Sequence, residues 1–317
     1  MVSMKTTSFQ TVLIVNPRSA NGKTGRRWPT IEGIVHREFR GRFDVVFTEG
    51  PLHATTVTRQ HLDRGYNLVV AVGGDGLVNE VVNGFFEDGQ NLHPNAVLGL
   101  LPVGTASDFV KSLGWNRDLA RAVRRLNGTQ TRRVDVGRAT FCDFQGEKRT
   151  RCFVNVADFG AGGAVVEKVN RTSKIFGGPF SFLWGILSIL PRYRNTEIHL
   201  TMDGGGQVSA ILNNVIVANG KYYGGCIRAA PDASIDDGCF QCVVVKDVTF
   251  SEVLWNLPRF LRGDHLTHPK VESHRAAWLR ATSTERVLIE VDGELIGTLP
   301  GVFDILPRAL LVRVSDE

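Results

Sequence analysis

Short aliphatic runs recur through the first third of the chain, and they constrain its fold more than any other feature. Four of them are separated by stretches with the spacing of amphipathic helices, and their sequences are TVLIVNP, FDVVFTE, NLVVAV and AVLGLLP. Strands with so few polar residues that alternate with helices are typical of a parallel sheet covered on both faces. The sequence therefore predicts an N-terminal α/β domain. Ligands of such sheets bind at the carboxyl ends of the strands.

The pattern changes in the middle of the chain. From there on, strand-like stretches with Gly, Asn and Asp turns predominate, and helical patterns appear only near residues 163–190 and 251–262. This texture is typical of an antiparallel, β-rich domain. We predict an α/β domain over residues 1–135 and a β-rich domain over residues 136–302.

The composition is that of an ordinary globular protein, since 43% of the 317 residues are hydrophobic and 22% are charged. The net charge of +5 fits a partner that carries phosphate or an anionic membrane surface. Arginine pairs such as Arg132 and Arg133 fit a solvated surface equally well. Composition alone therefore selects no function.

Several features favour a cytoplasmic protein. Five cysteines, an odd number in a chain of this length, argue against a disulfide framework and for a reducing compartment. The N-terminus lacks the pattern of a secretory signal. The longest apolar run, residues 176–190, is shorter than the roughly 20 residues that a membrane-spanning helix needs.

A glycine-rich turn ends the third aliphatic run, within VVAVGGDGLVNEVVNGF at residues 69–85. Consecutive glycines let a ligand approach the bare backbone, and the N–H groups that open the following helix favour an anion. The pattern is neither a P-loop nor a Rossmann fingerprint. Asp75 in the turn can hold a metal, accept a proton or cap the helix. Glu80 in the helix can face the solvent or the phosphates.

A second turn repeats this arrangement in PVGTASDF, residues 102–109, where Thr105 supplies a hydroxyl and Asp108 opens a helix. Both turns follow neighbouring strands of the predicted sheet. Together with Asp135, the acids Asp75 and Asp108 can form an acidic, Mg²⁺-binding cleft for a nucleotide.

Four motifs, in this order, resemble the diacylglycerol kinase catalytic-domain family: GGDGLVNEVVNG, LPVGTASDFVKSLG, PDASIDDGCF and VDGELIG. The resemblance covers nearly the whole chain. It implies an ATP-dependent kinase that phosphorylates a hydroxyl of a lipid such as diacylglycerol. The implied fold is of the NAD kinase and diacylglycerol kinase type, with a nucleotide-binding domain over residues 1–135 and a β-sandwich lipid-substrate domain over 136–302. The segment from about 303 to 317 would return to the first domain.

The resemblance also implies roles for individual residues. The residues that would bind the nucleotide lie in four loops and in the helix that follows the third, and they are Asn16, Pro17, Thr48, Gly73, Gly74, Asp75, Gly76, Asn79, Glu80, Gly104 and Thr105. Glu294 would be the catalytic base for the acceptor hydroxyl. Asp75 would be the second catalytic residue, with its carboxylate at the metal centre. The residues that would hold Mg²⁺ are Asp75, Asp108 and Asp135 at the active site, and Ser234, Asp237 and Cys239 at a second, structural site. From the residues alone, the second site can equally be a plain Asp-Gly turn.

Two positions depart from the family pattern. Leu77 stands where the family has threonine after GGDG, and Ser107 stands before the acid of the second turn in place of asparagine. Because no charge is lost, a kinase remains the prediction. An NAD kinase-like enzyme for small molecules and a non-catalytic regulator that binds nucleotide or lipid are the alternatives.

The expected partners are a nucleotide and a lipid substrate at the membrane surface, with peripheral membrane contact and no nucleic acid. A homodimer is left open. The run FGGPFSFLWGILSIL with the PRYR that follows it, residues 176–194, combines aromatic and cationic residues. It can contact the bilayer surface or form a buried helix of the second domain.

Overall fold

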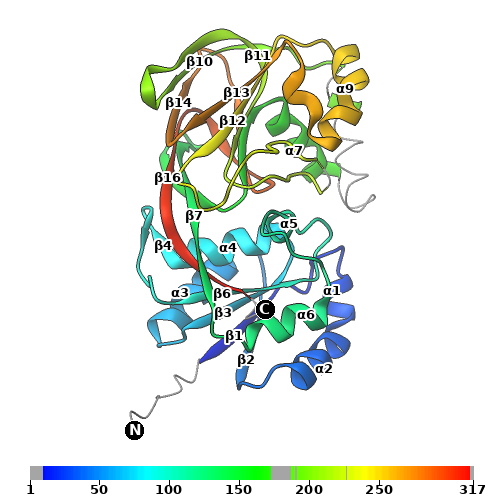
Figure 1. Ribbon diagram of the computed structural model, residues 1–317, viewed down its shortest axis with the longest axis vertical. Helices are drawn as coiled ribbons and strands as arrows, with labels where there is room; N and C mark the ends of the chain where they lie inside the picture. The colour runs from blue at the N-terminus through cyan, green and yellow to red at the C-terminus, as the bar shows by residue number, and fades with distance from the viewer. Residues whose placement is uncertain (1–9, 173–186, 190, 226, 315–317) are drawn as a thin grey trace.

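The computed structural model describes residues 10–172, 187–189, 191–225 and 227–314. They form two lobes stacked along the long axis of the molecule, with the N-terminal lobe below (Figure 1). Most of the segment 176–194, for which we predicted membrane contact or a buried helix, lies outside the described residues. No helix in the described part of the chain is both long enough and apolar enough to cross a membrane.

The first lobe contains a parallel sheet in the order β2-β1-β3-β6. These strands are β1 (Thr11–Val15), β2 (Phe43–Phe47), β3 (Leu68–Gly73) and β6 (Val97–Pro102). Helices cover both faces, because separate groups of buried side chains join the sheet to α3 and α4 and to α2 and α6. The helices and small strands of this lobe are α1 (Lys23–Arg26), α2 (Trp28–Glu38), α3 (His53–Asp63), α4 (Asp75–Phe85), β4 (Phe86–Glu87), β5 (Gln90–Asn91), α5 (Asp108–Ser112) and α6 (Leu119–Leu126). The predicted α/β domain is confirmed.

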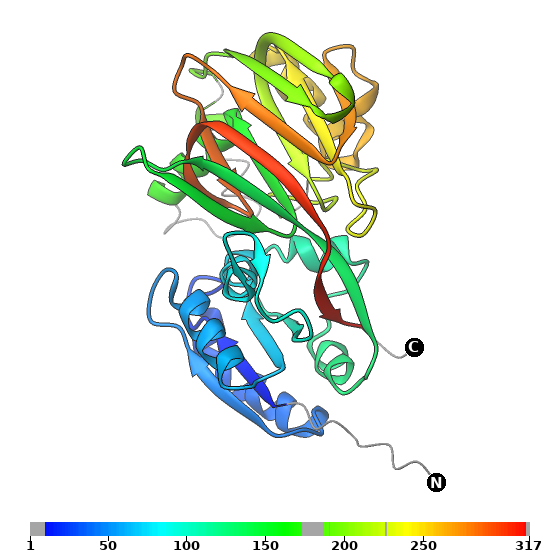
Figure 2. The ribbon, with the colours of Figure 1, turned by 90° about the vertical axis from the view of Figure 1, so that its left-hand side faces the viewer.

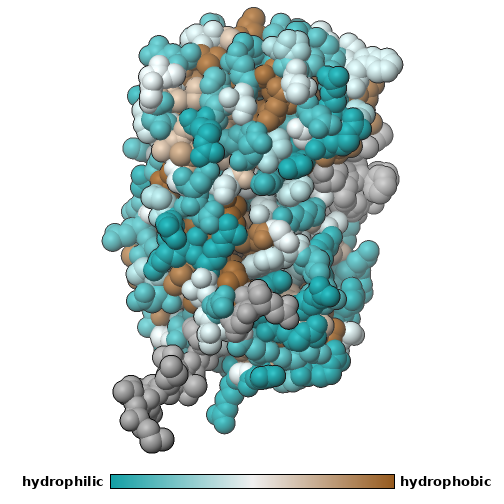
Figure 3. Space-filling model, viewed as in Figure 1, coloured by the Kyte–Doolittle hydropathy of each residue, from teal (hydrophilic) through white to brown (hydrophobic). Residues whose placement is uncertain are grey.

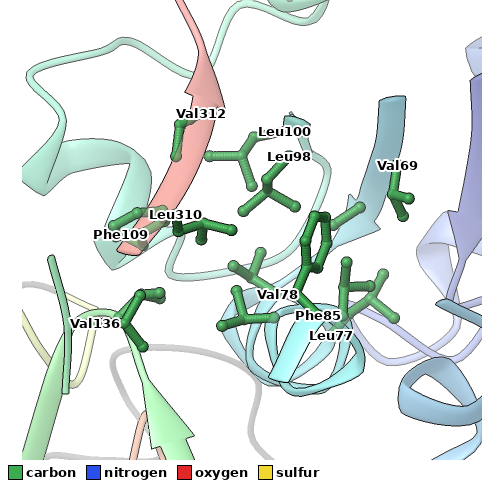
Figure 4. Close-up of a cluster of buried hydrophobic side chains, with 14 of the residues drawn as sticks. Val69, Leu77, Val78, Phe85, Leu98, Leu100, Phe109, Val136, Leu310 and Val312 are labelled. Atoms are coloured by element: carbon green, nitrogen blue, oxygen red, sulfur yellow. The ribbon is translucent and has the colours of Figure 1, made fainter. Parts of the chain in front are cut away.

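The apolar face of α4 fixes the position of the glycine turn that precedes it. Leu77, Val78 and Phe85 point from α4 into a cluster that includes Leu98 and Leu100 of β6 (Figure 4). Leu77 is 4% exposed. The leucine at this departure from the family pattern therefore fills core volume beside the turn.

The second lobe is β-rich and largely antiparallel, as predicted. Its strands are β8 (Lys148–Phe153), β9 (Val156–Gly160), β10 (Thr196–Met202), β11 (Gln207–Ala218), β12 (Phe240–Lys246), β13 (Val271–Ala276), β14 (Trp278–Thr282) and β15 (Leu288–Val291). Its helices in the described segments are α7 (Ala161–Thr172), α9 (Phe250–Arg262) and the 3₁₀ turns η1 (Asp203–Gly205) and η2 (Asp264–Thr267). Side chains from β9, β11, β12, β14 and β15 form its main core.

Two long strands, β7 (Thr131–Cys142) and β16 (Glu294–Arg313), run through both lobes. They are antiparallel to each other, and Figure 2 shows them side by side from the upper lobe to the lower one. At its far end β16 pairs with β6 through Leu311 and Val312, in parallel. Residue 135, where we predicted the domain boundary, lies inside β7.

Candidate active site

The two glycine turns touch at the carboxyl edge of the parallel sheet. The Gly104 N–H donates to the Gly73 carbonyl at 2.9 Å. A Cβ atom on Gly104 would lie 2.2 Å from the Cα of Gly74. Arg117 secures the second turn, because its Nη1 donates to the Thr105 carbonyl at 2.8 Å. The closeness of the two backbones explains why the second turn needs glycine at position 104, whereas a Cβ atom on Gly73 would meet the side chain of Leu77 at 2.6 Å.

We expect Gly104→Ala to weaken ATP binding by about tenfold or more and to destabilise the fold by roughly 1–3 kcal/mol, because the new methyl group forces the two turns apart. Titration calorimetry with ATP and thermal unfolding measure these effects. Gly33→Ala is the control, since nothing lies within 4 Å of a Cβ at that helical position. The strain argument is wrong if both variants bind ATP equally well.

The loops that follow β1 and β2 lie at the same edge. The Asn16 N–H donates to the Val72 carbonyl of β3, and the Thr48 N–H donates to the Val15 carbonyl of β1. The Asn16 side chain accepts from the Arg18 N–H at 2.9 Å, which shapes the loop. Pro17 belongs to this loop as well. The structure therefore brings three sets of predicted residues to the carboxyl edge of the parallel sheet. They are the Asn16–Pro17 loop, Thr48 and the two glycine turns.

Asp75 opens α4 and contacts the start of α5. Its Oδ1 accepts from the Phe109 N–H at 3.2 Å. Burial first, and then the nearby charges of Asp108 and Asp292, raise the pKa of Asp75 to about 7, although backbone hydrogen bonds oppose the increase. A carboxylate surrounded in this way gains most from a bound cation.

The carboxylate oxygens of Asp108 have partners in both lobes. Its Oδ1 pairs with Lys111 Nζ at 2.9 Å, and its Oδ2 accepts from the Gly225 N–H of the second lobe at 2.7 Å. Together with Asp75, Glu290 and Asp292, it lines a cavity of about 170 Å³ between the lobes.

Asp135 is not among the residues that line this cavity, which does not favour its predicted role beside Asp75 and Asp108. Its carboxylate accepts from the Gly238 N–H at 2.7 Å and from the Arg308 N–H at 2.6 Å. It therefore ties β7 to the loop before β12 and to β16. Asp292 stands near Asp75 instead, and sequence reasoning missed it although it belongs to the VDGE motif.

The four hydrogen bonds of Asp292 are structural. Its oxygens accept from the N–H groups of Val154, Asn155 and Val156 and from Asn79 Nδ2, at 2.9–3.1 Å. Its contribution to the cleft is therefore negative charge beside Asp75, with no free oxygen for a further ligand.

The side chains of Asn79 and Glu80 face protein partners, which does not favour their predicted contact with the nucleotide. Asn79 is fully buried, and its amide donates to the Cys152 carbonyl while its Oδ1 accepts from Arg151. Glu80 accepts from the N–H groups of Leu52 and Ala54 and so stabilises the start of α3. Carboxylates are favoured near helix N-termini.

Glu294 reaches the first glycine turn from the second lobe. A Cβ atom on Gly76 would lie 3.0 Å from Glu294 Oε1. The side chain is exposed to solvent, yet the surrounding protein raises its pKa by desolvation. Arg151 opposes this increase and Glu80 adds to it. A carboxylate with a raised pKa next to a phosphate-type turn is suited to general base catalysis.

The loop from Ser234 to Cys239 does not favour the second Mg²⁺ site. Asp237 is the one side-chain carboxylate in that predicted ligand set, and its Oδ2 pairs with Arg275 at 2.6 Å. Its Oδ1 accepts from the Cys239 N–H, while the Ser234 hydroxyl donates to Asp236. A cation there would have to displace Arg275.

Asp158 and Glu290 form a buried acid pair that sequence reasoning missed. They face each other across β9 and β15, and both are 0% exposed. Burial raises the pKa of Asp158 to about 7. Burial, and then the charge of Asp158, raise the pKa of Glu290 well above its ordinary value. At least one of the two therefore keeps its proton at neutral pH. The signal in the sequence was an acid in each of two apolar strands.

We expect Asp158→Asn to stabilise the protein more at pH 8 than at pH 5. The native pKa of Asp158 is about 7, above that of an unfolded chain. The loss in free energy of unfolding that comes from the buried Asp158 carboxyl is thus absent below about pH 4. It grows to roughly 2–4 kcal/mol as the pH rises towards 7. Urea unfolding at both pH values measures it.

Asp143→Asn is the control for this experiment. The Glu147 N–H and Arg149 lower the pKa of Asp143, so its substitution should cost stability at pH 8. An equal effect of Asp158→Asn at both pH values would contradict the buried-pair interpretation.

Known proteins match nearly the whole chain. The family model of the diacylglycerol kinase catalytic domain matches residues 10–139, and that of the YegS C-terminal NAD kinase beta sandwich-like domain matches residues 155–314. A diacylglycerol kinase of Staphylococcus carnosus is 30% identical over 92% of this chain and 90% of its own length. One of Bacillus subtilis is 29% identical over 87% and 89%, respectively.

Solved structures show the same fold. A diacylglycerol kinase structure from Bacillus anthracis aligns over 98% of this chain and 99% of its own, with a TM-score of 0.72 and 21% identity. Yeast NADH kinase aligns over 98% and 85% with a TM-score of 0.50 and 12% identity.

Proposed function

Because this chain belongs to the diacylglycerol kinase catalytic-domain family, we propose that it is a lipid kinase that transfers a phosphoryl group from ATP to a hydroxyl of a lipid such as diacylglycerol. The observation that carries the proposal is the meeting of Glu294 with Gly76. It brings a carboxylate of the second lobe to the glycine turn of the first, within 3.0 Å of the Cβ position. This contact supports the proposal that the phosphate donor and the lipid acceptor meet beside Gly76.

The two glycine turns hold the phosphates of ATP. The backbone of Gly73, Gly74 and Gly76 can approach the phosphates closely, and the start of α4 offers N–H groups to an anion. Thr105 and the Asn16–Pro17 loop lie at the same edge of the sheet. Phosphoryl transfer depends mainly on such positioning and on charge neutralisation.

Asp75 is the residue that fits Mg²⁺ best. Mg²⁺ is usually bound by one or two carboxylates, by waters and by substrate phosphates, which matches a single partly free carboxylate in an acidic cleft. Asp108 supports it from the opposite side, with its oxygens held by Lys111 and Gly225. When bound, the ion would neutralise charge on the transferred group.

Glu294 accepts the proton of the acceptor hydroxyl. Desolvation raises its pKa, which makes its carboxylate a stronger base than that of an ordinary glutamate. Since a lipid acceptor lies in a membrane, the enzyme works in peripheral contact with the bilayer surface.

The test is an acceptor screen. Purified protein is incubated with labelled ATP and Mg²⁺ and with diacylglycerol, ceramide, sphingosine or phosphatidylglycerol in detergent micelles, and separately with NAD. We expect transfer to a lipid and none to NAD. Phosphorylation of NAD would favour the small-molecule kinase, and tight ATP binding without any transfer would favour the non-catalytic regulator.

A further inference from the structure

The helix α9 exposes an unusual outer face. None of its residues is buried, and Trp255 is 84% exposed. Leu254 and Leu261 are 46% and 40% exposed on the same side of the helix. Single exposed apolar residues are normal, but a helix that presents three together is an apolar surface that needs an explanation.

The inner face of α9 is fixed to the second lobe. Val253, Leu257 and Phe260 line a cavity of about 100 Å³ together with Val245 and Val271. At the N-terminus Thr249 and Glu252 form a capping box, and Lys270 Nζ pairs with Glu252 at 2.7 Å. The outer residues therefore stay exposed on a helix that is held in place.

Basic residues lie beside the apolar ones. Arg259 and Arg262 follow Trp255 by one and two helical turns and lie on the same outer face. The guanidinium of Arg259 has no hydrogen bond or ion pair with any residue that the structure describes. Arg262 pairs with Asp264 at 3.1 Å, but both side chains are more than 60% exposed, and such pairs are weak.

We propose that this outer face, formed by Leu254, Trp255, Leu261 and the two arginines, is a docking surface for an anionic lipid bilayer. An interfacial helix places leucine and tryptophan in the headgroup region and arginine against lipid phosphates. Tryptophan in particular favours the boundary between water and acyl chains. The net charge of +5 adds attraction between the whole molecule and an anionic membrane.

The size of the surface favours a bilayer over a second copy of the chain. A stable protein interface buries roughly 1,200–2,000 Å² and takes about 20–30 residues from each side, which one helix face does not supply. A bilayer accepts a single amphipathic helix. On the face shown in Figure 3, hydrophobic residues occur in small groups among hydrophilic ones, as on ordinary protein surfaces.

The surface lies on the same side of the upper lobe as α7, away from β14 (Figure 1). This placement supplies a matched control in Trp278 of β14, which is 39% exposed. Trp255→Glu and Trp278→Glu carry the same chemical change on two sides of one lobe.

The experiment is co-sedimentation with vesicles of phosphatidylglycerol and phosphatidylcholine that contain no acceptor lipid. Trp255→Glu should weaken binding by about ten- to a hundredfold, the effect of removing one large apolar side chain from its contact. Arg259→Glu should weaken vesicle binding less than Trp255→Glu does. The effect of Arg259→Glu should be larger at low salt than at high salt. Trp278→Glu should bind like the wild type, and all proteins should bind pure phosphatidylcholine poorly.

Three outcomes overturn the proposal. The first is equal binding of both tryptophan variants, and the second is wild-type protein that does not sediment with anionic vesicles. The third is a dimer that Trp255→Glu converts to a monomer in analytical ultracentrifugation, which would make the face an interface between copies. The docking proposal rests on the proposed kinase function only in its choice of a lipid bilayer as the partner. A second assay therefore separates the docking proposal from the kinase proposal. Transfer to diacylglycerol in detergent micelles should not change in Trp255→Glu, and its absence in the wild type would refute the kinase alone.

Discussion

Replacement of Asp75 by asparagine is expected to lower kcat by about a thousandfold or more, the scale at which phosphoryl-transfer enzymes lose a charge-neutralising element. Asparagine can still accept from the Phe109 N–H, so the start of α4 and the turn keep their geometry. It cannot supply the negative charge that attracts Mg²⁺. The variant should therefore lose catalysis without losing its fold.

Stability distinguishes this loss from unfolding. Asp108 and Asp292 repel an ionised Asp75, and burial adds to the cost. The neutral side chain removes both penalties, so Asp75→Asn should unfold at the same temperature as the wild type or above it. Asp63→Asn is the control, because Asp63 is an exposed acid that pairs with His93. Turnover of Asp75→Asn within tenfold of the wild type would refute a role at the metal centre.

Glu294→Gln is the second substitution with a large expected effect. If Glu294 is the base, kcat should fall by about a hundred- to ten-thousandfold while the KM for ATP changes little. The reason is that glutamine keeps the size of the side chain beside Gly76 but cannot accept the proton of the hydroxyl. Steady-state kinetics with ATP and diacylglycerol measure both constants.

The pH profile adds a second signature. Desolvation raises the pKa of Glu294, so wild-type activity should fall on the acidic side at a pH above the ordinary range of a glutamate. That decline reports protonation of the base, and it should disappear from the residual activity of Glu294→Gln. Glu147→Gln on the exposed β7–β8 hairpin is the control and should keep the wild-type profile. An unchanged acidic limb in Glu294→Gln would assign the base to another residue.

The fold could be predicted because local patterns dictate most of it. The strands β1, β3 and β6 are buried at every position, and the strands of the first lobe are separated by helices with one apolar face, a pattern that a covered parallel sheet satisfies. The glycine turns could be predicted for the same reason, since Gly73 ends β3 and Gly104 closely follows the end of β6.

The contacts between distant segments could not be predicted in this way. Asp135 was grouped with Asp75 and Asp108 as an acid that the resemblance implies at the Mg²⁺ site, but its carboxylate accepts from the N–H groups of Gly238 and Arg308. Nothing in the sequence around Asp135 shows whether its side chain turns towards Asp75 or towards Gly238 and Arg308. The pairing of Asp158 with Glu290 depends in the same way on the register of β9 and β15, which only the assembled sheet defines.

The path of β16 has a consequence for the order in which the protein folds during synthesis. The outer edge of β6 is made early, but its partners Leu311 and Val312 are made only after the other strands of the second lobe. While the second lobe is being synthesised, that edge remains an open strand edge, which is a template for pairing with other chains. The sheet of the first lobe is therefore completed only after the second lobe has been translated, although most of the first lobe is translated before it. A nascent chain that stalls before Leu310 would be prone to aggregation even with all of its helices in place.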